Sequence, residues 1–462
     1  MGLSDSLGGY FDVQAHDSSV RTELLAGLTT FLTMSYIVVV NPAILAQAIS
    51  IEGIPSGEIQ SMLAVVTIIA AATATFVMAV YANRPFAQAP GLGLNAFFAF
   101  TVVGALGIPW QTALAAVVVE GILFIILTAV GAREYVIGLF PEPVKFAVGT
   151  GIGLFLAIIG LQAMGVVVDD PATLISMGSL ASNPVAIVSI VGLFFTFVLY
   201  ARNVPGSIII GILATTLLGW WITAFGPVAP DAGLVAGAAT VSYDITPLAG
   251  AFVSGFAGIE AFTFALIVFT FFFVDFFDTA GTLVGVGQAG DFLDEDGNLP
   301  GIDRPLMADA IGTTVGGMLG TSTVTTYIES ASGVEEGGRT GLTALTIAAL
   351  FVASLAIVPL ATIIPLYASH IALVVIGVLM LKNVVDLDWD DITNVIPAGL
   401  TILVMPFTYS IAYGIAAGIV SYPLVKLAAG EREDVRIGHW VLAGAFVLYF
   451  VVRTGGILTA QV

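Results

Sequence analysis

The sequence of 462 residues lacks cysteine altogether and is poor in charge, since only 10% of its residues are Asp, Glu, Lys or Arg. Without cysteine, disulfides, thiolate metal sites and cysteine nucleophiles are excluded. The three histidines, His16, His370 and His439, are too few and too scattered for a histidine metal site. A soluble domain carries about 25% charged residues, so this chain cannot cover itself with a charged surface.

What the chain does have is apolar residues, which make up 58% of it and give a mean hydropathy of +1.05. The solvent of such a chain is mostly the lipid bilayer. Its 52 glycines suit close contact between helices in a membrane. We therefore expect a polytopic membrane protein built of α-helices, with the bilayer as its main partner.

The few charges are unbalanced, with a formal net charge of −20 and lysine at only three positions, Lys145, Lys382 and Lys426. A solvated acidic surface that is poor in lysine is typical of halophilic proteins, because high salt screens its self-repulsion. The first twenty residues are polar and have neither a basic n-region nor an apolar h-region. We expect no removable signal peptide and an N-terminus in the cytoplasm.

A spanning helix needs about 20 apolar residues. Nine segments meet this, three are apolar but shorter, and two are apolar but broken by glycine and small polar residues. The nine long segments are 22–47, 61–82, 111–132, 144–164, 184–201, 206–226, 258–280, 340–361 and 366–382. The three shorter segments are 392–409, 411–428 and 438–453. The two broken segments are 88–106 and 305–337. The total is about 14, least certain after residue 390. If these spans alternate from an inner N-terminus, every basic residue except Arg453 lies on the inner side, as the positive-inside rule requires.

Two of the segments are interrupted in corresponding ways. The first carries APGLGLNAFF at residues 89–98, and the second carries GTSTVTTYIESASG at residues 320–333. Broken segments at matching positions in two halves indicate an inverted-repeat transporter, with its site where the breaks meet. Unwound backbone at this depth is tolerated only where it lines a cavity or is buried in protein.

Acidic residues within the spans are the strongest functional signal. Asp275 and Asp278 lie one turn apart in the eighth span, Glu329 lies in the tenth, and Glu120 lies in the fourth without a nearby polar cluster. A charge at the bilayer centre costs about 2.5–3.5 kcal/mol on insertion scales. No lysine or arginine lies in these spans to pair with the acids. They must therefore face a polar cavity or carry protons, as the coupling groups of a proton-driven carrier do. The alternative for each is a protonated hydrogen bond between helices.

Glu329 lies in a run rich in threonine, TSTVTTYI, which favours a short strand with exposed backbone groups. On the other broken segment, Gly91 and Gly93 allow close approach of a ligand, and Asn95 offers one acceptor and two donors. Thr326 and the rings of Phe97 and Phe273 complete the expected contacts, although most of the phenylalanines at 271, 272, 273, 276 and 277 are expected to pack against helices or lipid. This set has acceptors, aromatic faces and no cation. It suits a flat heterocycle with several N–H donors, such as a purine or pyrimidine base.

Three other classes fit less well. A membrane aspartyl protease needs two facing aspartates, usually on separate helices, whereas both aspartates here share one helix. An anion transporter of the same inverted-repeat architecture would use helix N-termini without fixed acids. A xanthine/uracil-type nucleobase carrier stays open as an alternative. GGRTG at 337–341 lacks the P-loop lysine, and DFLDEDGNLPG at 291–301 lacks the EF-hand spacing.

At these residues the sequence resembles a known family. RTELLAGLTTFLTMSYIVVVNPAIL (21–45), APGLGLNAFF (89–98), FFFVDFFDTAGTLVGV (271–286) and GTSTVTTYIESASGVEEGGRTGLTA (320–344) resemble the AzgA-like purine permeases. These belong to the nucleobase–cation symporter family, which is related to uracil and xanthine permeases. The resemblance covers residues 18–455.

The resemblance implies 14 spans in two inverted repeats of seven, a core and a gate domain, and short antiparallel strands in the third and tenth segments. It also implies proton-coupled uptake of hypoxanthine, guanine or adenine. Asp275 and Glu329 would be the main base-binding acids, with Asn95 assisting. Asp278, together with Glu329 and Asp275, would serve proton coupling.

The expected domain organisation is a cytoplasmic segment (1–20), a first repeat (21–228), an extracellular connection (229–257) and a second repeat (258–455). We expect a multi-pass protein of the cell membrane that is not an enzyme. No cofactor and no nucleic-acid partner are expected. The coupling ion is H⁺, with Na⁺ left open, and the architecture is compatible with a homodimer.

Overall fold

The computed structural model describes residues 3–131, 140–226, 228–229, 231–237, 240–294 and 299–454. Arg133 and the side chains of Phe277 and Arg453, which enter the predictions above, lie outside the described part. Within that part, ten helices are long and apolar enough to cross a membrane, and three apolar helices are shorter. This confirms a polytopic all-α membrane protein, while the count of fourteen spans stays a prediction.

The first half of the chain contains nine described α-helices and three short strands, and two of the helices, α4 and α5, have a π-helical continuation (η). They are α1 (Leu3–Tyr10), α2 (Val20–Met34), α3 (Ile37–Leu45), α4 (Ser56–Val77) with η2 (Met78–Ala82), β1 (Gln88–Pro90), α5 (Leu92–Ala96) with η3 (Phe97–Ala105), α6 (Trp110–Ala129), α8 (Glu142–Ala163), β2 (Val167–Asp170), β3 (Leu174–Met177), α9 (Pro184–Ala201) and α10 (Ser207–Phe225), with the 3₁₀ turns η1 (Val13–His16) and η4 (Leu180–Ser182).

The second half follows with the same kinds of element. They are η5 (Ala251–Phe256), α11 (Ala261–Ala289), α12 (Asp303–Leu319), β4 (Val324–Thr326), α13 (Ser330–Glu335), α14 (Gly341–Ser354), η6 (Leu355–Ile357), α15 (Val358–Ile363), α16 (Leu366–Ser369), α17 (Ile371–Met380), η7 (Leu381–Asp386), α18 (Ile392–Thr408), α19 (Ile411–Ala429), η8 (Arg432–Asp434) and α20 (Ile437–Thr454).

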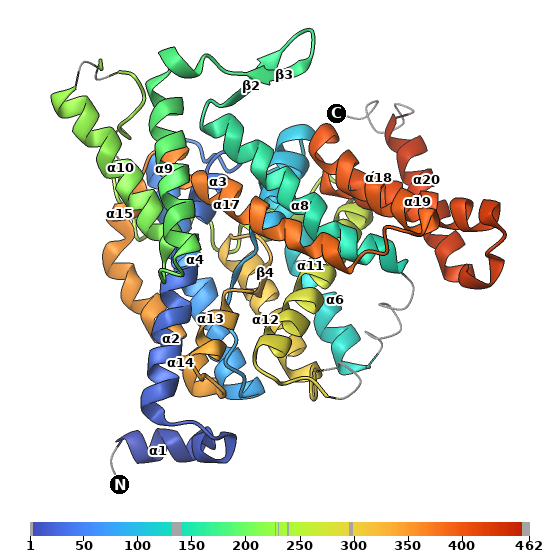
Figure 1. The fold of residues 1–462 in the computed structure, drawn as a ribbon, viewed down its shortest axis with the longest axis horizontal. Coiled ribbons are helices and arrows are strands. Elements are labelled where there is room, and N and C mark those ends of the chain that lie inside the picture. Colours follow the sequence, from blue (N-terminus) through green and yellow to red (C-terminus); the bar gives the residue numbers. More distant parts are fainter. Residues whose placement is uncertain are drawn as a thin grey trace.

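The helices pack in two groups, each drawn from both halves of the sequence. In one group α12 packs on α4 and α6, α14 packs on α2 and α4, and α11 packs on α6. In the other, α8 packs on α17 and α18, α9 packs on α10, and α18 packs on α19. In Figure 1, α9 and α10 lie to the left and α18 to α20 to the right, with α8 between them. This division corresponds to the expected core and gate bundles.

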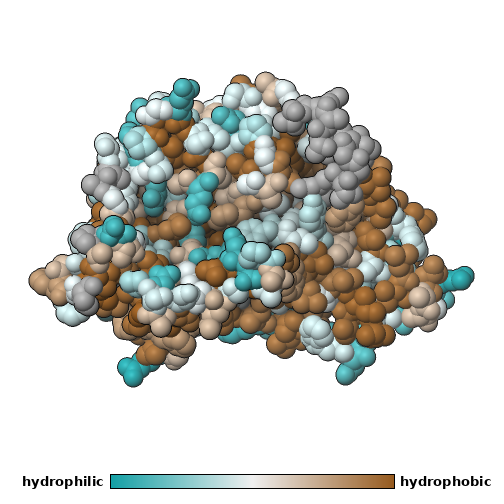
Figure 2. Space-filling model, turned by 90° about the horizontal axis from the view of Figure 1, so that it is seen from above, coloured by the Kyte–Doolittle hydropathy of each residue, from teal (hydrophilic) through white to brown (hydrophobic). Residues whose placement is uncertain are grey.

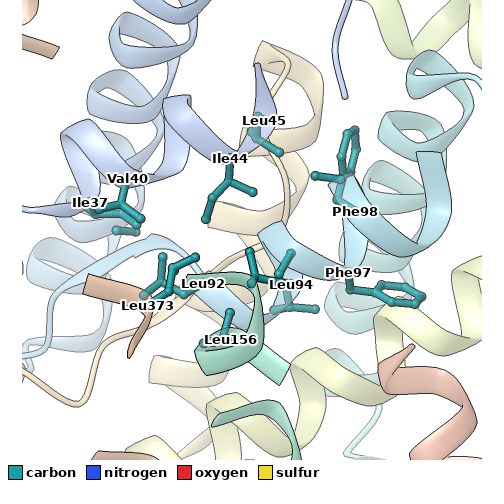
Figure 3. Packing of buried hydrophobic residues seen from close by; sticks show 14 of the residues in the cluster. Ile37, Val40, Ile44, Leu45, Leu92, Leu94, Phe97, Phe98, Leu156 and Leu373 are labelled. Atoms are coloured by element: carbon teal, nitrogen blue, oxygen red, sulfur yellow. The ribbon is translucent and has the colours of Figure 1, made fainter. Parts of the chain in front are cut away.

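A continuous apolar core joins the two groups. Figure 3 shows its centre, where Ile37 and Ile44 of α3 lie near Leu92 and Leu94 of α5, with Leu156 of α8 beside them. All five side chains are at most 7% exposed. The third segment therefore packs against helices of both bundles, so a movement of one bundle relative to the other would change its contacts.

The outer flanks are apolar too, as expected for a protein solvated by lipid. Phe194 of α9 and Leu217 and Trp221 of α10 are each more than 60% exposed. Seen from above, hydrophobic residues cover much of the flank, and polar residues lie near the middle of that face and at several points of its edge (Figure 2).

Helix α11 is longer than the apolar pattern predicts, because it continues from residue 280 to Ala289. The added turns are rich in Gly, Val and Thr, and α11 also packs against α13. Packing between helices thus stabilises a helical stretch that hydropathy alone does not predict. The helix begins at Glu260, whose carboxylate accepts hydrogen bonds from the N–H groups of Phe262 and Thr263 at 2.8 and 2.7 Å.

Candidate functional site

The two broken segments meet as a pair of short strands. β1 pairs antiparallel with β4, with Gln88 opposite Thr326, Ala89 opposite Thr325 and Pro90 opposite Val324. The pairing extends by one bond at each end, since Gly91 N donates to Thr323 O at 3.0 Å and Tyr327 N donates to Ala87 O at 2.9 Å. The strand predicted within TSTVTTYI is thereby confirmed, and all six residues of the pair are buried.

Each strand leads into a short helix, so the chain changes direction twice inside the protein. β1 is followed by α5, and β4 is followed by α13, whose first residue, Ser330, accepts from Ala87 N at 3.0 Å. Before β4, α12 ends at Gly320, where φ is +105°, a conformation that favours glycine. The six strand residues are buried, as non-helical backbone within a bilayer requires, whereas Ile328, between β4 and α13, is 52% exposed.

Asp278 and Glu329 are the two acids of the site that are partly exposed. A Cβ placed on Gly91, next to the end of β1, would be 3.6 Å from Asp278 Oδ2, and Glu329 lies between β4 and α13. The Tyr36 hydroxyl donates to Glu329 Oε1 at 2.5 Å. These two carboxylates are the groups best placed to meet a ligand.

Tyr36 reaches Glu329 because the first span is broken. α2 ends at Met34 and α3 begins at Ile37, so Tyr36 lies at the junction between them. Tyr327 follows β4 directly, and its hydroxyl donates to Pro90 O at 2.5 Å. Both tyrosine rings are at most 6% exposed. Together they fix the end of β1 and one oxygen of Glu329.

Asp275 lies deeper than Asp278 and is fully buried. Its Oδ1 lies 3.2 Å from Thr279 Oγ1, and its carboxyl lies near that of Glu120. Glu120 also accepts from Thr323 Oγ1 at 3.1 Å. The expectation that Glu120 lacks a polar cluster is therefore wrong. Its partners lie on α11 and on the approach to β4, far away in sequence.

Asp309 of α12 completes this buried group. Its Oδ1 accepts from Thr326 N at 2.9 Å and from Gln88 Nε2 at 3.2 Å, and its Oδ2 lies 3.0 Å from Thr279 Oγ1, whose single proton can go either to this oxygen or to Asp275 Oδ1. One carboxylate therefore holds both strands and α11 in place.

The remaining predicted contacts are buried side chains with partners in the protein. The amide oxygen of Asn95 accepts from Ser322 Oγ, and its Nδ2 donates to Pro90 O at 3.4 Å. Thr326 Oγ1 lies 3.3 Å from Asp309 Oδ1. Asn95 thus ties α5 to the start of the tenth segment, and Thr326 points toward α12.

The two predicted rings are also enclosed, each at most 2% exposed. Phe97 packs edge-on against Phe271, with the ring centroids 4.9 Å apart, and Phe273 packs edge-on against Phe140 at 4.0 Å. In this conformation both rings therefore contact neighbouring rings. Phe272 and Phe276 likewise stack on Phe124 of α6.

Sequence reasoning missed Tyr36, Gln88, Asp309 and Tyr327. Asp309 satisfies the criterion that singled out the other acids, since it lies in an apolar helix without a basic neighbour on that helix beyond Arg304. Tyr36 lies inside one of the quoted motif segments. Gln88 and Tyr327 flank the two strands, so the expected strand pairing was the signal that could have identified them.

The described part of the chain shows no basic side chain near these acids. Its ion pairs all involve Lys426, which contacts Asp391, Glu431 and Asp434 at the other bundle. Within the same residues no group of three His, Cys, Asp or Glu side chains is arranged to hold a metal ion. The site can therefore accept hydrogen bonds from a neutral or cationic ligand, and it can hold protons.

Comparison with known proteins agrees with this architecture. Residues 21–417 match the Permease family. Adenine permease AdeP of Escherichia coli is 40% identical to this chain, over 96% of this chain and 95% of AdeP. Guanine/hypoxanthine permease PbuO of Bacillus subtilis is also 40% identical, over 96% of this chain and 99% of PbuO. Both matches extend beyond the broken segments to nearly the whole chain.

Among solved structures, the transmembrane domain of a cyanobacterium bicarbonate transporter, BicA, has a similar fold. The TM-score is 0.59 at 16% sequence identity, over 86% of this chain and 97% of that chain. At this identity the likeness concerns the fold alone.

Proposed function

Because this chain belongs to the Permease family, we propose that it is a secondary transporter that takes up the purine nucleobases hypoxanthine, guanine and adenine. One observation carries the proposal: Asp278, close to Gly91 after β1, and Glu329, just after β4, are both partly exposed, and no described basic side chain forms an ion pair with them. A purine presents N–H donors to such acceptors. The names of the adenine and guanine/hypoxanthine permeases that are similar to this chain support the same substrate class.

In this proposal Glu329 and Asp278 accept N–H groups of the base. Tyr36 holds Glu329 in one orientation, so less conformational freedom is lost when the base binds. Asp275 is 0% exposed, so a direct contact with the base requires α11 to rotate or shift. We therefore propose that Asp275 does not contact the base directly in this conformation. Thr279 and Glu120 connect it to the strands. Asn95 supports the base site by holding α5 against Ser322.

We also propose that the transporter is driven by protons. The carboxyls of Glu120, Asp275 and Asp309 are buried and contact the hydroxyl groups of threonines. When such a group gains or loses a proton, the charge of the buried carboxyls next to the strands changes. This change in charge couples protonation to binding of the base. Sodium is the competing ion, and a sodium gradient applied without a proton gradient separates the two.

The alternatives make different demands on the site. An anion transporter would place its substrate against Asp278 and Glu329, which would repel it. A xanthine or uracil carrier would use the same acceptors, so only competition between bases distinguishes it. We propose further that the protein is a multi-pass transporter and not an enzyme, with a cytoplasmic N-terminus, and that it works as a homodimer.

The decisive experiment is uptake of radiolabelled hypoxanthine by cells that lack their own purine permeases. Adenine and guanine should compete, and xanthine and uracil should compete weakly. A protonophore should abolish accumulation, whereas accumulation driven by sodium alone would replace H⁺ by Na⁺ as the coupling ion. Absence of purine uptake by a correctly inserted protein would overturn the proposal.

A further inference from the structure

A cavity is formed by residues of η1, of the end of η2 and of the start of α12. The end of the molecule that carries α1 and η1 is the lower end in Figure 1. The volume of the cavity is about 390 Å³. The cavity is lined by His16, Ala82, Asn83, Arg84, Gly301 and Arg304. These residues come from three separate parts of the chain: η1, the turn after η2, and the turn that leads into α12. Three basic side chains thus face one cavity, in a protein that has only 12 lysines and arginines against 32 acids.

The two arginines keep free donors. All ion pairs between described residues involve Lys426, so neither Arg84 nor Arg304 is paired with a described carboxylate. Arg84 donates once, to Pro300 O at 2.5 Å, and its guanidinium lies 5.6 Å from the ring of Phe292. A guanidinium has five N–H donors, so most of those of Arg84 stay available.

Burial of Arg84 affects the pKa of its guanidinium group. Burial lowers the pKa of Arg84 from its usual value, because part of its hydration is lost without a carboxylate to replace it. Asp17 and Asp303, which are adjacent in sequence to His16 and Arg304, are exposed and do not line the cavity. The charge of the cavity wall is therefore positive and unbalanced among the described residues.

The walls of this cavity are fixed by the fold. Asn83, with φ of +50°, accepts from Gly341 N at 2.8 Å and donates to Phe11 O at 3.3 Å. Phe11 and Val13 are buried against Leu342 of α14. The segment that carries His16 is thus anchored on the helices, and its position does not depend on a ligand.

Two exposed apolar residues precede the cavity along η2. Val80 and Tyr81 are 37% and 49% exposed. An anion with an apolar tail could lie along this helix while its head group enters the cavity. The positive-inside rule would place the cavity on the cytoplasmic side, where acidic lipids and soluble phosphates are both available.

We propose that this cavity binds a phosphate group, held by the guanidinium groups of Arg84 and Arg304 with His16 beside them. Two guanidinium groups on one phosphate give charge-assisted hydrogen bonds, which are the strong class. The phosphate belongs either to the head group of an acidic phospholipid or to a soluble phosphate, and the chemistry of the cavity is the same for both. The phosphate site is separate from Asp278 and Glu329, so this proposal does not depend on the identity of the transported substrate.

The test uses the full-length protein, purified in detergent and stripped of lipid. Binding of phosphatidylglycerol, phosphatidylcholine and inorganic phosphate is measured by native mass spectrometry and calorimetry. We expect phosphatidylglycerol or inorganic phosphate to bind and phosphatidylcholine to bind more weakly than phosphatidylglycerol. Each basic side chain near a membrane surface contributes about 1 kcal/mol, so Arg304→Gln should weaken binding about fivefold, and Arg84→Gln with Arg304→Gln should weaken it further.

Two control variants keep the test sharp. Arg304→Lys retains the charge and should retain most of the binding, which separates loss of charge from misfolding. Arg432→Gln removes a basic residue from the other bundle and should change nothing. Binding of phosphatidylglycerol alone identifies the lipid, and binding of inorganic phosphate identifies the soluble source. If neither ligand binds, or if Arg304→Gln binds both like the wild type, the proposal is wrong.

Discussion

The hydroxyl of Tyr36 donates a hydrogen bond of 2.5 Å to Oε1 of Glu329, and so joins two residues that are 293 positions apart in the sequence. Tyr36 lies between α2 and α3, and Glu329 lies between β4 and α13. The bond connects the break in the first span with the break in the tenth. It leaves Glu329 Oε2 as the oxygen that can accept from a ligand.

We predict that Tyr36→Phe raises the KM for hypoxanthine about tenfold, because a hydrogen bond to a charged group contributes about 1.5–3 kcal/mol. The maximal rate should fall less, since the carboxylate itself stays. Uptake as a function of hypoxanthine concentration gives both values. Tyr81→Phe, at an exposed position on η2, is the matched control and should behave like the wild type. An unchanged KM in Tyr36→Phe would show that this bond does not orient Glu329 for binding.

Glu329→Gln should abolish high-affinity uptake while the protein still reaches the membrane. The amide keeps the shape of the side chain, but one of its two oxygens is replaced by a donor that cannot accept the N–H of a base. Surface expression and radiolabelled hypoxanthine uptake are measured together. Glu336→Gln, an exposed position after α13, controls for loss of one charge. Normal uptake by Glu329→Gln would remove this residue from the site.

Asp275 and Asp278 should fail in different ways. Asp278→Asn removes a partly exposed acceptor and should raise the KM, whereas Asp275→Asn changes the buried group around Glu120 and should mainly lower the maximal rate and alter its dependence on pH. Initial rates across a range of pH, at saturating and at limiting hypoxanthine, separate the two effects. If Asp275→Asn raises the KM as strongly as Asp278→Asn, then Asp275 contacts the base directly, as the family resemblance implies.

These two aspartates also show how far sequence reasoning reaches. Hydropathy and residue type were enough to place both in one span and to assign them function. Which of them is partly exposed depends on the rotation of α11 about its axis, and that is set by packing of Phe272 and Phe276 on Phe124 of α6. Contacts between distant helices decide such a rotation, and a spacing of three residues carries no information about them.

The strands also show which features the sequence predicts and which depend on the fold. The β-branched run around Val324 predicts extended backbone, and the glycines near residue 91 predict a break. The register, with Gln88 opposite Thr326, is set by Asp309, which binds both residues from α12. Asp309 was not recognised because its role exists only when three segments of the fold come together. Glu120 was given no polar neighbours for the same reason.

Asp309 should be a stability residue as well as a site residue. Asp309→Ala leaves Thr326 N and Gln88 Nε2 without their acceptor, and each buried polar group left unsatisfied costs about 1–3 kcal/mol. We expect a lower thermal unfolding midpoint and loss of uptake. Asp309→Asn keeps one acceptor oxygen and should be milder, and Asp303→Asn, at the exposed start of the same helix, should be neutral. Equal midpoints for all three variants would contradict the role of Asp309 in holding the strands.

Asp391 gives the prediction for pH. It begins α18, where its Oδ1 accepts from Thr393 Oγ1 at 2.7 Å and from Thr393 N at 2.8 Å, with Lys426 Nζ 3.5 Å from its Oδ2. The hydrogen bonds from Thr393 lower the pKa of Asp391 below its usual 3.8. A lowered pKa means that the folded state favours the carboxylate, so this contribution to stability is present above pH 3.8 and is lost as the pH falls through the lower folded value.

The difference in unfolding midpoint between the wild type and Asp391→Asn should therefore shrink as the pH falls below 3.8, and stay constant above it. The comparison is a difference between two proteins, so acid effects that are common to both cancel. Asp390→Asn, one residue earlier and exposed, should show no such trend. A difference that is independent of pH would mean that Thr393 and Lys426 bind the neutral side chain as well as the carboxylate.

The close approach of Gly91 to Thr325 gives the last prediction. A Cβ on Gly91 would lie 2.8 Å from Thr325 Cγ2, so Gly91→Ala should push the strands apart beside Asp278 and raise the KM for hypoxanthine. Replacing Thr325 by Ser removes that methyl group but keeps the hydroxyl that bonds to Thr279. The double variant should therefore recover much of the lost uptake, whereas Gly399→Ala, with open space around it, should cost nothing. If Thr325→Ser gives no recovery, then the defect of Gly91→Ala does not arise from this contact, and the strands tolerate a wider spacing than their geometry indicates.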